Sequence, residues 1–486
     1  MSTNALLVRE PRVINQRSRG GAAAAWALHR RLALISFGVL AVLYSTVAIQ
    51  RQVTFRTAGW DLGIFVQAIR NYSQLRAPIV ILKGPDYNLL GDHFHPIIAL
   101  LAPFYAVFPT ALTLLVAQAI LFALGSWPLV RWAQTVVSTR VAVAVAIVYG
   151  LSFGLGAALT FDFHEIAFAV PLISFSISAL GQRRTVAAVV WAIPLVFVKE
   201  DLGLTFVAVV GVILFARGHR KLGLATVIAG ATASIVEVAV VVPFFNSSGT
   251  YAYWSHVTQQ SVFSAFATEP GTKLATLLLT AAVAGFACFV SPLALAAVPT
   301  LLWRFFSSDS AYWGVDYHYS AVLMPIMVAS LIDGVVKFRR SGSRRSRTIS
   351  HGFVAVAVAV TIGMLPSTGF ASVVDANQWA WTNRDAAITE ALAIIPPDAR
   401  VAASDNLIPQ LTSRDTVTEF GHTAVAQGPP TWIIVDAGST RHFAVTPQAE
   451  QRDLRLAEAS GYRIRLNKFG VTVLERQPSS GNLPTP

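Results

Sequence analysis

Four short segments of the chain combine residue types that could do chemistry. They are WDLGIF (60–65), GDHFHP (91–96), FDFHE (161–165) and VKEDLG (198–203). A carboxylate can take a proton from a hydroxyl nucleophile, carboxylates with imidazoles can bind a divalent cation, and a lysine can bind a phosphate as a point charge. Each segment alone could equally be a polar turn or a helix cap. They form a site only if the fold brings them together.

The elements that must position these residues are membrane helices. Of the 486 residues, 54% are hydrophobic and only 13% are charged, whereas a soluble protein carries roughly a quarter charged residues. Apolar runs such as 141–159 and 222–245 approach the roughly 20 residues that span a bilayer. The lone cysteine, Cys288, excludes a disulfide framework and a Cys-based zinc site. The net charge is +12. The basic residues that cause it lie between apolar runs, which argues against nucleic acid as a partner.

Basic residues predict the orientation of the chain in the bilayer. Residues 1–30 hold five arginines, with Arg31 following, before the first apolar run and are expected to form a cytoplasmic basic segment. Later basic clusters at 131–140, 183–184, 217–221 and 337–347 each fall where an alternating count of spans returns the chain to the cytoplasm. We therefore predict a multi-pass plasma-membrane protein with a cytoplasmic N-terminus.

The predicted fold is an all-α polytopic membrane domain over residues 31–369, with about eleven transmembrane helices. The expected spans are 32–50, 106–130, 140–159, 166–181, 185–198, 202–217, 222–245, 273–289, 291–306, 319–336 and 351–368. Residues 96–130 could instead hold two short crossings, or a re-entrant piece and one crossing. The basic residues that follow favour a single net crossing there.

A small extracytoplasmic α/β domain is expected over residues 370–476, where the composition becomes that of a soluble protein. Its predicted elements are helices at 383–395 and 448–460, a buried strand in TWIIVD (431–436), and a pair of strands in YRIRL and FGVTVLE. Asn383 is the expected N-cap of the first helix. Residues 477–486 are expected to form a disordered tail.

On this map the acids, histidines and aromatics face outside, and plain basic residues face inside. Asp162, His164 and Glu165 share one short turn, a set that suits Mg²⁺, Mn²⁺ or Ca²⁺ and, less readily, Zn²⁺. Glu237 interrupts an apolar span about 12 Å from its outer end, and an ionisable residue at membrane depth is a functional candidate. His318 begins a span at the outer surface, where it could also be an ordinary interfacial residue.

The order of these motifs resembles a family of bacterial polytopic membrane proteins of unknown function, common in actinobacteria. LIPQLTSR (407–414) is also similar, and the resemblance covers about residues 35–475. That family is grouped by analogy with the GT-C superfamily of membrane glycosyltransferases, whose members use lipid-phosphate-linked sugar donors at the outer membrane face. Where family members often have a small residue, this chain has His95, so Asp92 and His93 are favoured over His95.

The resemblance implies roles for residues of WDLGIF and FDFHE, and it offers no counterpart for GDHFHP. Asp61 becomes the general base, Asp162 and Glu165 become second-loop acids that can bind a divalent metal, and His164 becomes an added ligand or a contact to the acceptor. The remaining candidates are substrate-binding residues, with Lys199, His318 and Arg304 as phosphate partners: Trp60, Asp92, His93, Lys199, Glu200, Asp201, Glu237, Arg304 and His318.

The expected function is transfer of a sugar from a polyprenyl-phosphate-linked donor to a glycan or glycolipid acceptor of the cell envelope. Inversion or retention at the sugar is left open. One alternative is a transporter or flippase for a lipid-linked precursor, which would place charged residues at mid-membrane in several spans. Another is a non-catalytic envelope assembly protein, which would leave the four motifs apart with no cavity between them.

Overall fold

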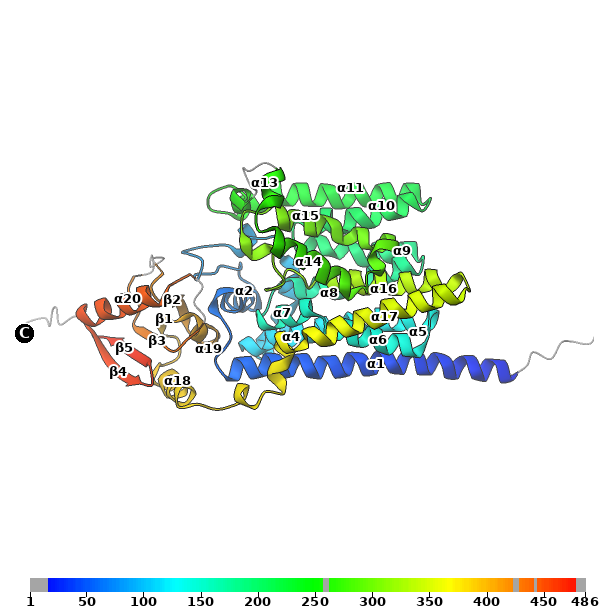
Figure 1. The fold of residues 1–486 in the computed structure, drawn as a ribbon. Helices are drawn as coiled ribbons and strands as arrows, with labels where there is room; N and C mark the ends of the chain where they lie inside the picture. The colour runs from blue at the N-terminus through cyan, green and yellow to red at the C-terminus, as the bar shows by residue number, and fades with distance from the viewer. Residues whose placement is uncertain (1–15, 257–261, 423–427, 441–443, 478–486) are drawn as a thin grey trace, which may run out of the picture.

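The computed structural model describes residues 16–256, 262–422, 428–440 and 444–477. Helices form an elongated bundle, and a small sheet lies at one end of it, which we call the sheet end (Figure 1). The predicted tail 477–486 lies, except for its first residue, outside the described residues, as does the first half of the basic segment 1–30.

Five helical segments are long and apolar enough to cross a membrane: Arg31–Val53, Ala111–Val136, Thr139–Thr160, Arg220–Phe245 and Arg344–Ser367. The helices within them are α1 (Gln16–Val53), α4 (Ala111–Leu124), α5 (Ser126–Val136), α6 (Thr139–Gly150), α7 (Phe153–Thr160), α11 (Arg220–Val236), α12 (Val242–Phe245) and α17 (Arg344–Met364). The expectation of a helical multi-pass membrane protein is therefore confirmed, while the number of crossings stays a prediction.

Shorter helices fill the rest of the bundle. They are α2 (Ile64–Ser73), α3 (Ala102–Val107), α8 (Ile166–Gly181), α9 (Thr185–Ala192), α10 (Ala208–Ala216), α13 (Val262–Ala267), α14 (Pro270–Val283), α15 (Val298–Phe306) and α16 (Leu323–Arg340). Helix α8 has the predicted bounds.

The predicted span at 106–130 is displaced in the structure. A short apolar helical stretch occupies Pro96–Val107, and the long helix begins at 111 because the Thr110 side chain accepts a hydrogen bond from the Leu112 N–H. That helix then runs to Val136. The sequence pattern missed the cap because the residues on both sides of it are equally apolar.

The hairpin predicted as spans 273–289 and 291–306 is more broken than expected. Helix α14 ends at Val283, because Gly285 and Phe286 both adopt left-handed backbone conformations. Two short helical turns, Ala287–Val290 and Pro292–Ala297, then lead into α15. Helix α16 likewise begins at Leu323 rather than at 319.

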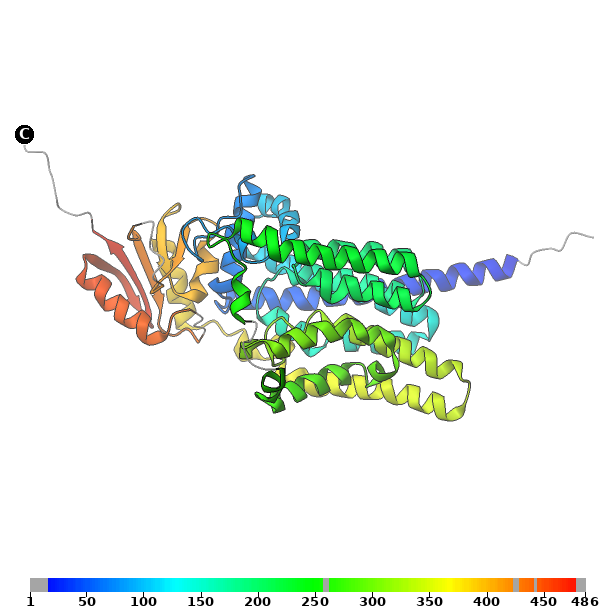
Figure 2. The same cartoon turned by 90° about the horizontal axis from the view of Figure 1, so that it is seen from above.

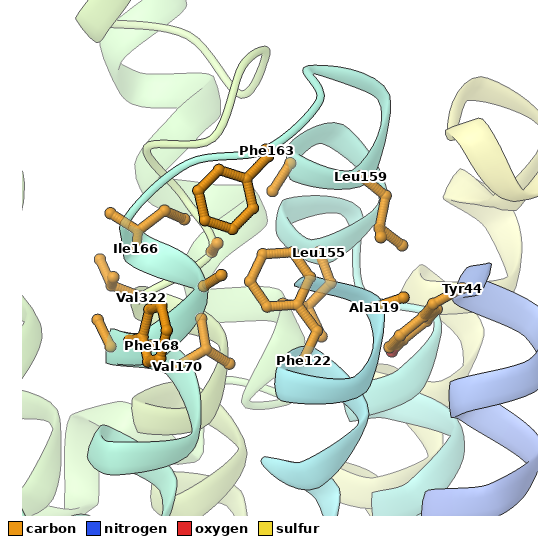
Figure 3. Packing of buried hydrophobic residues seen from close by; sticks show 14 of the residues in the cluster. Tyr44, Ala119, Phe122, Leu155, Leu159, Phe163, Ile166, Phe168, Val170 and Val322 are labelled. Carbon is orange, nitrogen blue, oxygen red and sulfur yellow. The ribbon is translucent and has the colours of Figure 1, made fainter. Parts of the chain in front are cut away.

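A buried hydrophobic core lies beneath the sheet end of the bundle. Tyr44 on α1 is fully buried and donates its hydroxyl to the Gly150 carbonyl of α6 at 2.8 Å. Phe163, Leu155 and Phe122 all belong to this core, and Phe163 lies near the top of the view in Figure 3. Since Phe163 is the middle residue of FDFHE, its burial fixes the acids and the histidine on either side of it.

The sheet has the strand order β2-β1-β3-β5-β4. Strands β1 (Arg400–Ala403), β2 (Thr416–Glu419) and β3 (Trp432–Asp436) are parallel, while β4 (Tyr462–Lys468) and β5 (Val471–Arg476) pair antiparallel. The domain that contains this sheet also has three helices, α18 (Asn383–Ile394), α19 (Ile408–Leu411) and α20 (Pro447–Ala459). The strand predicted in TWIIVD is confirmed as β3. The cap of α18 is Thr382, in a capping box with Asp385, and not Asn383 as predicted.

The basic turns gather at the end of the bundle away from the sheet. The α8–α9, α10–α11 and α16–α17 connections all lie there, and Figure 2 shows the same separation from above. Arg217 of one turn donates to the Leu180 carbonyl near another at 2.6 Å. This grouping agrees with the charge map, although it does not by itself fix which end faces the cytoplasm.

Candidate functional site

Asp61 lies in the loop between α1 and α2, at the sheet end. Its Oδ1 atom is 3.2 Å from His164 Nε2, and its side chain is 22% exposed. Its backbone is left-handed, with φ of 84°, so it does not act as the helix cap that its position before Leu62 allowed. Such a conformation costs a non-glycine residue about 1–3 kcal/mol and persists only where the surroundings hold it.

The FDFHE turn is fixed by residues from other helices. Asp162 accepts the Ala58 N–H at 2.8 Å and forms an ion pair with Arg51 at 3.2 Å. The Gln118 side chain donates to the Asp162 carbonyl at 2.7 Å and accepts the His164 N–H at 3.0 Å. These contacts hold the His164 ring against Asp61.

Glu165 and Lys199 form a buried ion pair beside this turn, with 2.9 Å between Oε1 and Nζ. Burial disfavours the charge on both groups. Even so, Lys199 lowers the pKa of Glu165 well below its usual range, and Glu165, Glu200 and Asp201 raise the pKa of Lys199. Lys199 therefore stays cationic. It lines a cavity of about 30 Å³ together with Asp201 and His318, which is room for about one water-sized group.

Glu200 connects the KED turn to GDHFHP. Its Oε1 is 2.7 Å from His93 Nδ1 and accepts the Tyr251 hydroxyl at 2.9 Å. Burial opposes ionisation of Glu200, but His93 and Lys199 outweigh it and lower the pKa to about 2. The His93 ring stacks on Tyr253 with centroids 4.3 Å apart.

Asp92 lies at the edge of the same group. It pairs with Lys83 Nζ at 2.5 Å and accepts the hydroxyls of Tyr87 and Tyr253. Burial raises its pKa, but Lys83 and the neighbouring histidines prevail and lower that pKa to about 2. Asp92 is thus a fixed carboxylate whose oxygens are already in use.

His318 stacks on His164 with ring centroids only 3.7 Å apart. It is 5% exposed, and both of its ring nitrogens lack a hydrogen-bond partner among the described residues. Burial, followed by the nearby His164 and Lys199, lowers the pKa of His318 well below its usual range. A neutral imidazole with two free nitrogens beside a cationic lysine can donate to or accept from a bound group.

Three other candidates make different contacts. Arg304 is fully buried and donates to the carbonyls of Tyr312 and Gly314 at 2.8 and 2.6 Å, so in this conformation it supports the loop before α16. Glu237 is 4% exposed within the segment 220–245, and one of its carboxylate oxygens lacks a partner. Asp201 accepts a long hydrogen bond from Thr205 at 3.4 Å.

The structure therefore brings the four motifs into one connected group. Asp61 contacts His164, Glu165 contacts Lys199, and Glu200 contacts His93, so each motif reaches the next through a direct contact or a chain neighbour. Trp60 lies on the side facing the sheet, where its ring is 6.1 Å from that of His422. His95, buried against Phe65, has its pKa lowered to about 4 by burial and is a core histidine.

The residues predicted as metal ligands do not fit a shared cation. Asp162 faces Arg51, His164 faces Asp61 and Glu165 faces Lys199. Among the described residues, no three His, Cys, Asp or Glu side chains are grouped so as to hold a metal ion. A divalent cation stays a prediction that this arrangement does not support.

Several residues that build the site were not singled out from the sequence. They are Arg51, Lys83, Gln118, Tyr251 and Tyr253, together with Asp405 and His422 of the sheet domain. Tyr251 and Tyr253 lie in the aromatic YAYW segment of an expected outer loop, which was a usable signal. Gln118 lies in an apolar helix, where a lone polar residue commonly serves packing or a partner helix.

Comparison with protein families gives one match over most of the chain. The model of a family described as "Predicted membrane protein (DUF2079)" matches residues 51–473. A search among curated proteins finds no match.

Solved structures give the fold. ArnT from Cupriavidus metallidurans bound to undecaprenyl phosphate is similar, with a TM-score of 0.55 and 13% identity over 92% of this chain and 98% of that chain. Its apo state gives a TM-score of 0.50 at 13% identity, over 93% and 98% of the two chains. The archaeal oligosaccharyltransferase AglB from Archaeoglobus fulgidus, in complex with an inhibitory peptide and a dolichol-phosphate, gives 0.43 at 12% identity over 93% and 75%. The GT-C-like fold expected from the motifs is confirmed.

Proposed function

We propose that this chain, which belongs to the DUF2079 family of predicted membrane proteins, is a membrane glycosyltransferase that uses a polyprenyl-phosphate-linked sugar donor. The observation that carries the proposal is the Asp61–His164 contact of 3.2 Å, at the sheet end of a GT-C-like bundle, next to the cationic Lys199. ArnT, with the same fold at 13% identity, was solved with undecaprenyl phosphate bound.

Each reacting group has a partner among the residues of the site. The Asp61 carboxylate takes the proton of an acceptor hydroxyl as the oxygen of that hydroxyl bonds to the anomeric carbon of the donor. The bond from that carbon to the phosphate oxygen breaks, and the electron pair stays on the polyprenyl phosphate. Lys199 and His318, which lie side by side in the site, stabilise the phosphate anion as it forms.

His164 orients the Asp61 carboxylate for this proton transfer. The contact of 3.2 Å between His164 Nε2 and Asp61 Oδ1 fixes the carboxylate in one orientation. Burial, and then the stacked His164 ring, disfavour a positive charge on His318 and lower its pKa. Trp60, next to Asp61, offers an apolar face for the acceptor sugar beside His422.

The proposed setting is the plasma membrane, with the basic turns inside and the sheet domain outside. This orientation lets the polyprenyl chain stay in the bilayer while its phosphate reaches the site laterally. The acceptor is a glycan or glycolipid of the cell envelope. Convergence of the four motifs weighs against the non-catalytic assembly role, which required them to lie apart.

The test is transfer by the full-length protein reconstituted in lipid nanodiscs. A panel of polyprenyl-phosphate-linked sugars is incubated with it and with an envelope extract as acceptor, and sugar-free polyprenyl phosphate is measured by mass spectrometry. We expect Asp61→Asn to abolish release, a loss of at least about 10²-fold for a general base.

Asp86→Asn is the matched control. Asp86 is an exposed acid of the same loop region that also adopts a positive φ, of 53°, and an asparagine tolerates that conformation. This variant should release polyprenyl phosphate at the wild-type rate. Wild-type release by a folded Asp61→Asn protein would remove Asp61 from the reaction. No release from any donor by the wild type would refute the proposed function itself.

A further inference from the structure

We propose that Asp405 and Ile408 of the sheet domain position the loop that carries Asp61, so that the membrane site is complete only when the domain is docked. Ile408 belongs to LIPQLTSR (407–414) and Asp405 lies two residues before it, so both are more than 340 residues from Asp61 along the chain. They touch the loop and not the proposed substrates, so they are positioning residues.

Asp405 holds the backbone immediately before Asp61. The Trp60 N–H donates to Asp405 Oδ1 at 2.8 Å. Asp405 follows strand β1, at the carboxyl end of the parallel strands, and is only 6% exposed. A hydrogen bond from a backbone N–H to a buried carboxylate is charge-assisted and therefore strong and directional. It fixes the peptide whose rotation would carry Asp61 away from His164.

Ile408 of the sheet domain packs against the same loop. A Cβ atom on Gly59 would lie 2.5 Å from Ile408 Cδ1, and one on Gly63 would lie 2.7 Å from Ile408 Cγ2. The loop backbone can approach the sheet domain this closely only because both positions are glycine. The two glycines flank Asp61 in the sequence, so Ile408 packs against the strained turn both before and after Asp61.

Further contacts fasten the helices on either side of the loop to the same part of the sheet domain. Gln410 donates to the Gln52 carbonyl near the end of α1 at 3.0 Å. From α2, Gln67 donates to the Val417 carbonyl at 2.9 Å, and Arg70 donates to the Asp415 carbonyl at 2.8 Å. The Asp61 loop is thus held between the sheet domain and the FDFHE turn.

The claim that the domain sets the loop conformation stands on these contacts alone, while its consequence for catalysis rests on the proposed function. The first measurement therefore needs no substrate. Hydrogen–deuterium exchange is followed in full-length protein in nanodiscs, comparing peptides that cover residues 57–66 with peptides that cover β3. We expect Asp405→Ala to speed exchange in 57–66 by about tenfold or more while β3 keeps its protection.

Asp405→Asn is the rescue variant, because its side-chain oxygen can still accept the Trp60 N–H. It should keep exchange in 57–66 within about threefold of wild type. Glu390→Ala is the control, since Glu390 is a half-exposed acid of the same domain that pairs with Lys468. It should leave residues 57–66 unchanged.

If Asp405→Ala unfolds the sheet domain, Ile408→Ala decides instead, and it too should speed exchange in 57–66. Wild-type protection of 57–66 in either alanine variant, with β3 intact, would overturn the inference. Equal exchange in Asp405→Asn and Asp405→Ala would also overturn the hydrogen-bond role.

Turnover then tests the consequence. Once a donor is identified, Asp405→Ala should lower kcat with the donor KM unchanged, because the donor's phosphate partners are untouched. A raised KM with unchanged kcat would contradict this. Failure of the wild type to turn over any donor would count against the proposed function and leave the exchange result standing.

Discussion

Replacing Lys199 by methionine separates the structural from the functional role of the buried cation. Methionine keeps most of the length and apolar character of lysine and removes its charge. Lys199 Nζ lies 2.9 Å from Glu165, and the two side chains are 17% and 2% exposed. The variant therefore leaves a buried carboxylate without its partner.

The magnitude follows from that distance. Unit charges 2.9 Å apart attract by about 6 kcal/mol at an effective dielectric constant of about 20. Both ions also pay for burial, so breaking such a pair destabilises a protein by about 3–5 kcal/mol. In the double variant Lys199→Met/Glu165→Gln no buried charge remains, and most of that stability should return.

The pH dependence of the stability of Lys199→Met tests whether the unpaired Glu165 carboxylate causes the loss. Without Lys199, burial raises the folded-state pKa of Glu165 above its unfolded value of about 4.3. The contribution of a raised carboxyl pKa is fully present below the unfolded value and is lost as the pH rises through the folded value. Denaturant unfolding of Lys199→Met should thus show near-normal stability at pH 4–5 and the full loss at pH 8. The double variant should show little dependence.

Binding of a polyprenyl-phosphate analogue supplies the functional readout. Both variants should bind it at least about tenfold more weakly than wild type, because a charged partner of the phosphate is gone. Lys468→Met is the control, since its pair with Glu390 is on the surface and both side chains are about half exposed. Wild-type affinity in a stable double variant would refute a role for Lys199 in phosphate binding.

Two further predictions test the sheet domain. Gly59→Ala should destabilise docking of the sheet domain by about 1–3 kcal/mol through contact with Ile408. Ile408→Gly in the same chain removes the Cβ atom that would lie 2.6 Å from the new side chain and should restore part of the loss; simple additivity in denaturant unfolding would contradict this. Burial, and then Asp405 and Glu450, raise the pKa of Glu419 to about 8. The protein should therefore lose stability as the pH rises from about 4 through 8. Because one pKa unit corresponds to about 1.4 kcal/mol, Glu419→Gln should be more stable than wild type by about 5 kcal/mol at pH 9 and by little at pH 4. An equal gain at both pH values would be a contradiction.

Local patterns predicted much of the fold. The helix at 166–181 and the strand in TWIIVD follow from apolar runs that end at polar residues. The failures occurred where apolar character continues through a break. Thr110 begins a helix inside an apolar stretch, and the chain turns at Gly285 within a predicted span. Hydropathy measures burial in lipid and is blind to such backbone changes.

The candidate site was predictable as a set of residues and not as a set of contacts. Charge patterning put Asp61 and His164 in one layer, because loops alternate between the two faces of a membrane. It could not give their direct contact, nor the bond from Trp60 to Asp405. Such pairs depend on how helices pack and how a separate domain docks, which no local pattern encodes. The metal prediction weakened for the same reason, since Arg51 and Lys199 take up two of the expected ligands.

The contact between Trp60 and Asp405 also sets an order of events during synthesis. Residues 59–63 leave the ribosome early, whereas the last strand of the sheet, β5, ends at Arg476. At about 5–20 residues per second, roughly 20–80 s of translation separate the two. Throughout that interval the Asp61 loop lacks the partner that holds its backbone. In a nascent or truncated chain that lacks the sheet domain, the backbone of the Asp61 loop is therefore not held in place. Docking of the sheet domain, which is translated last, completes the site.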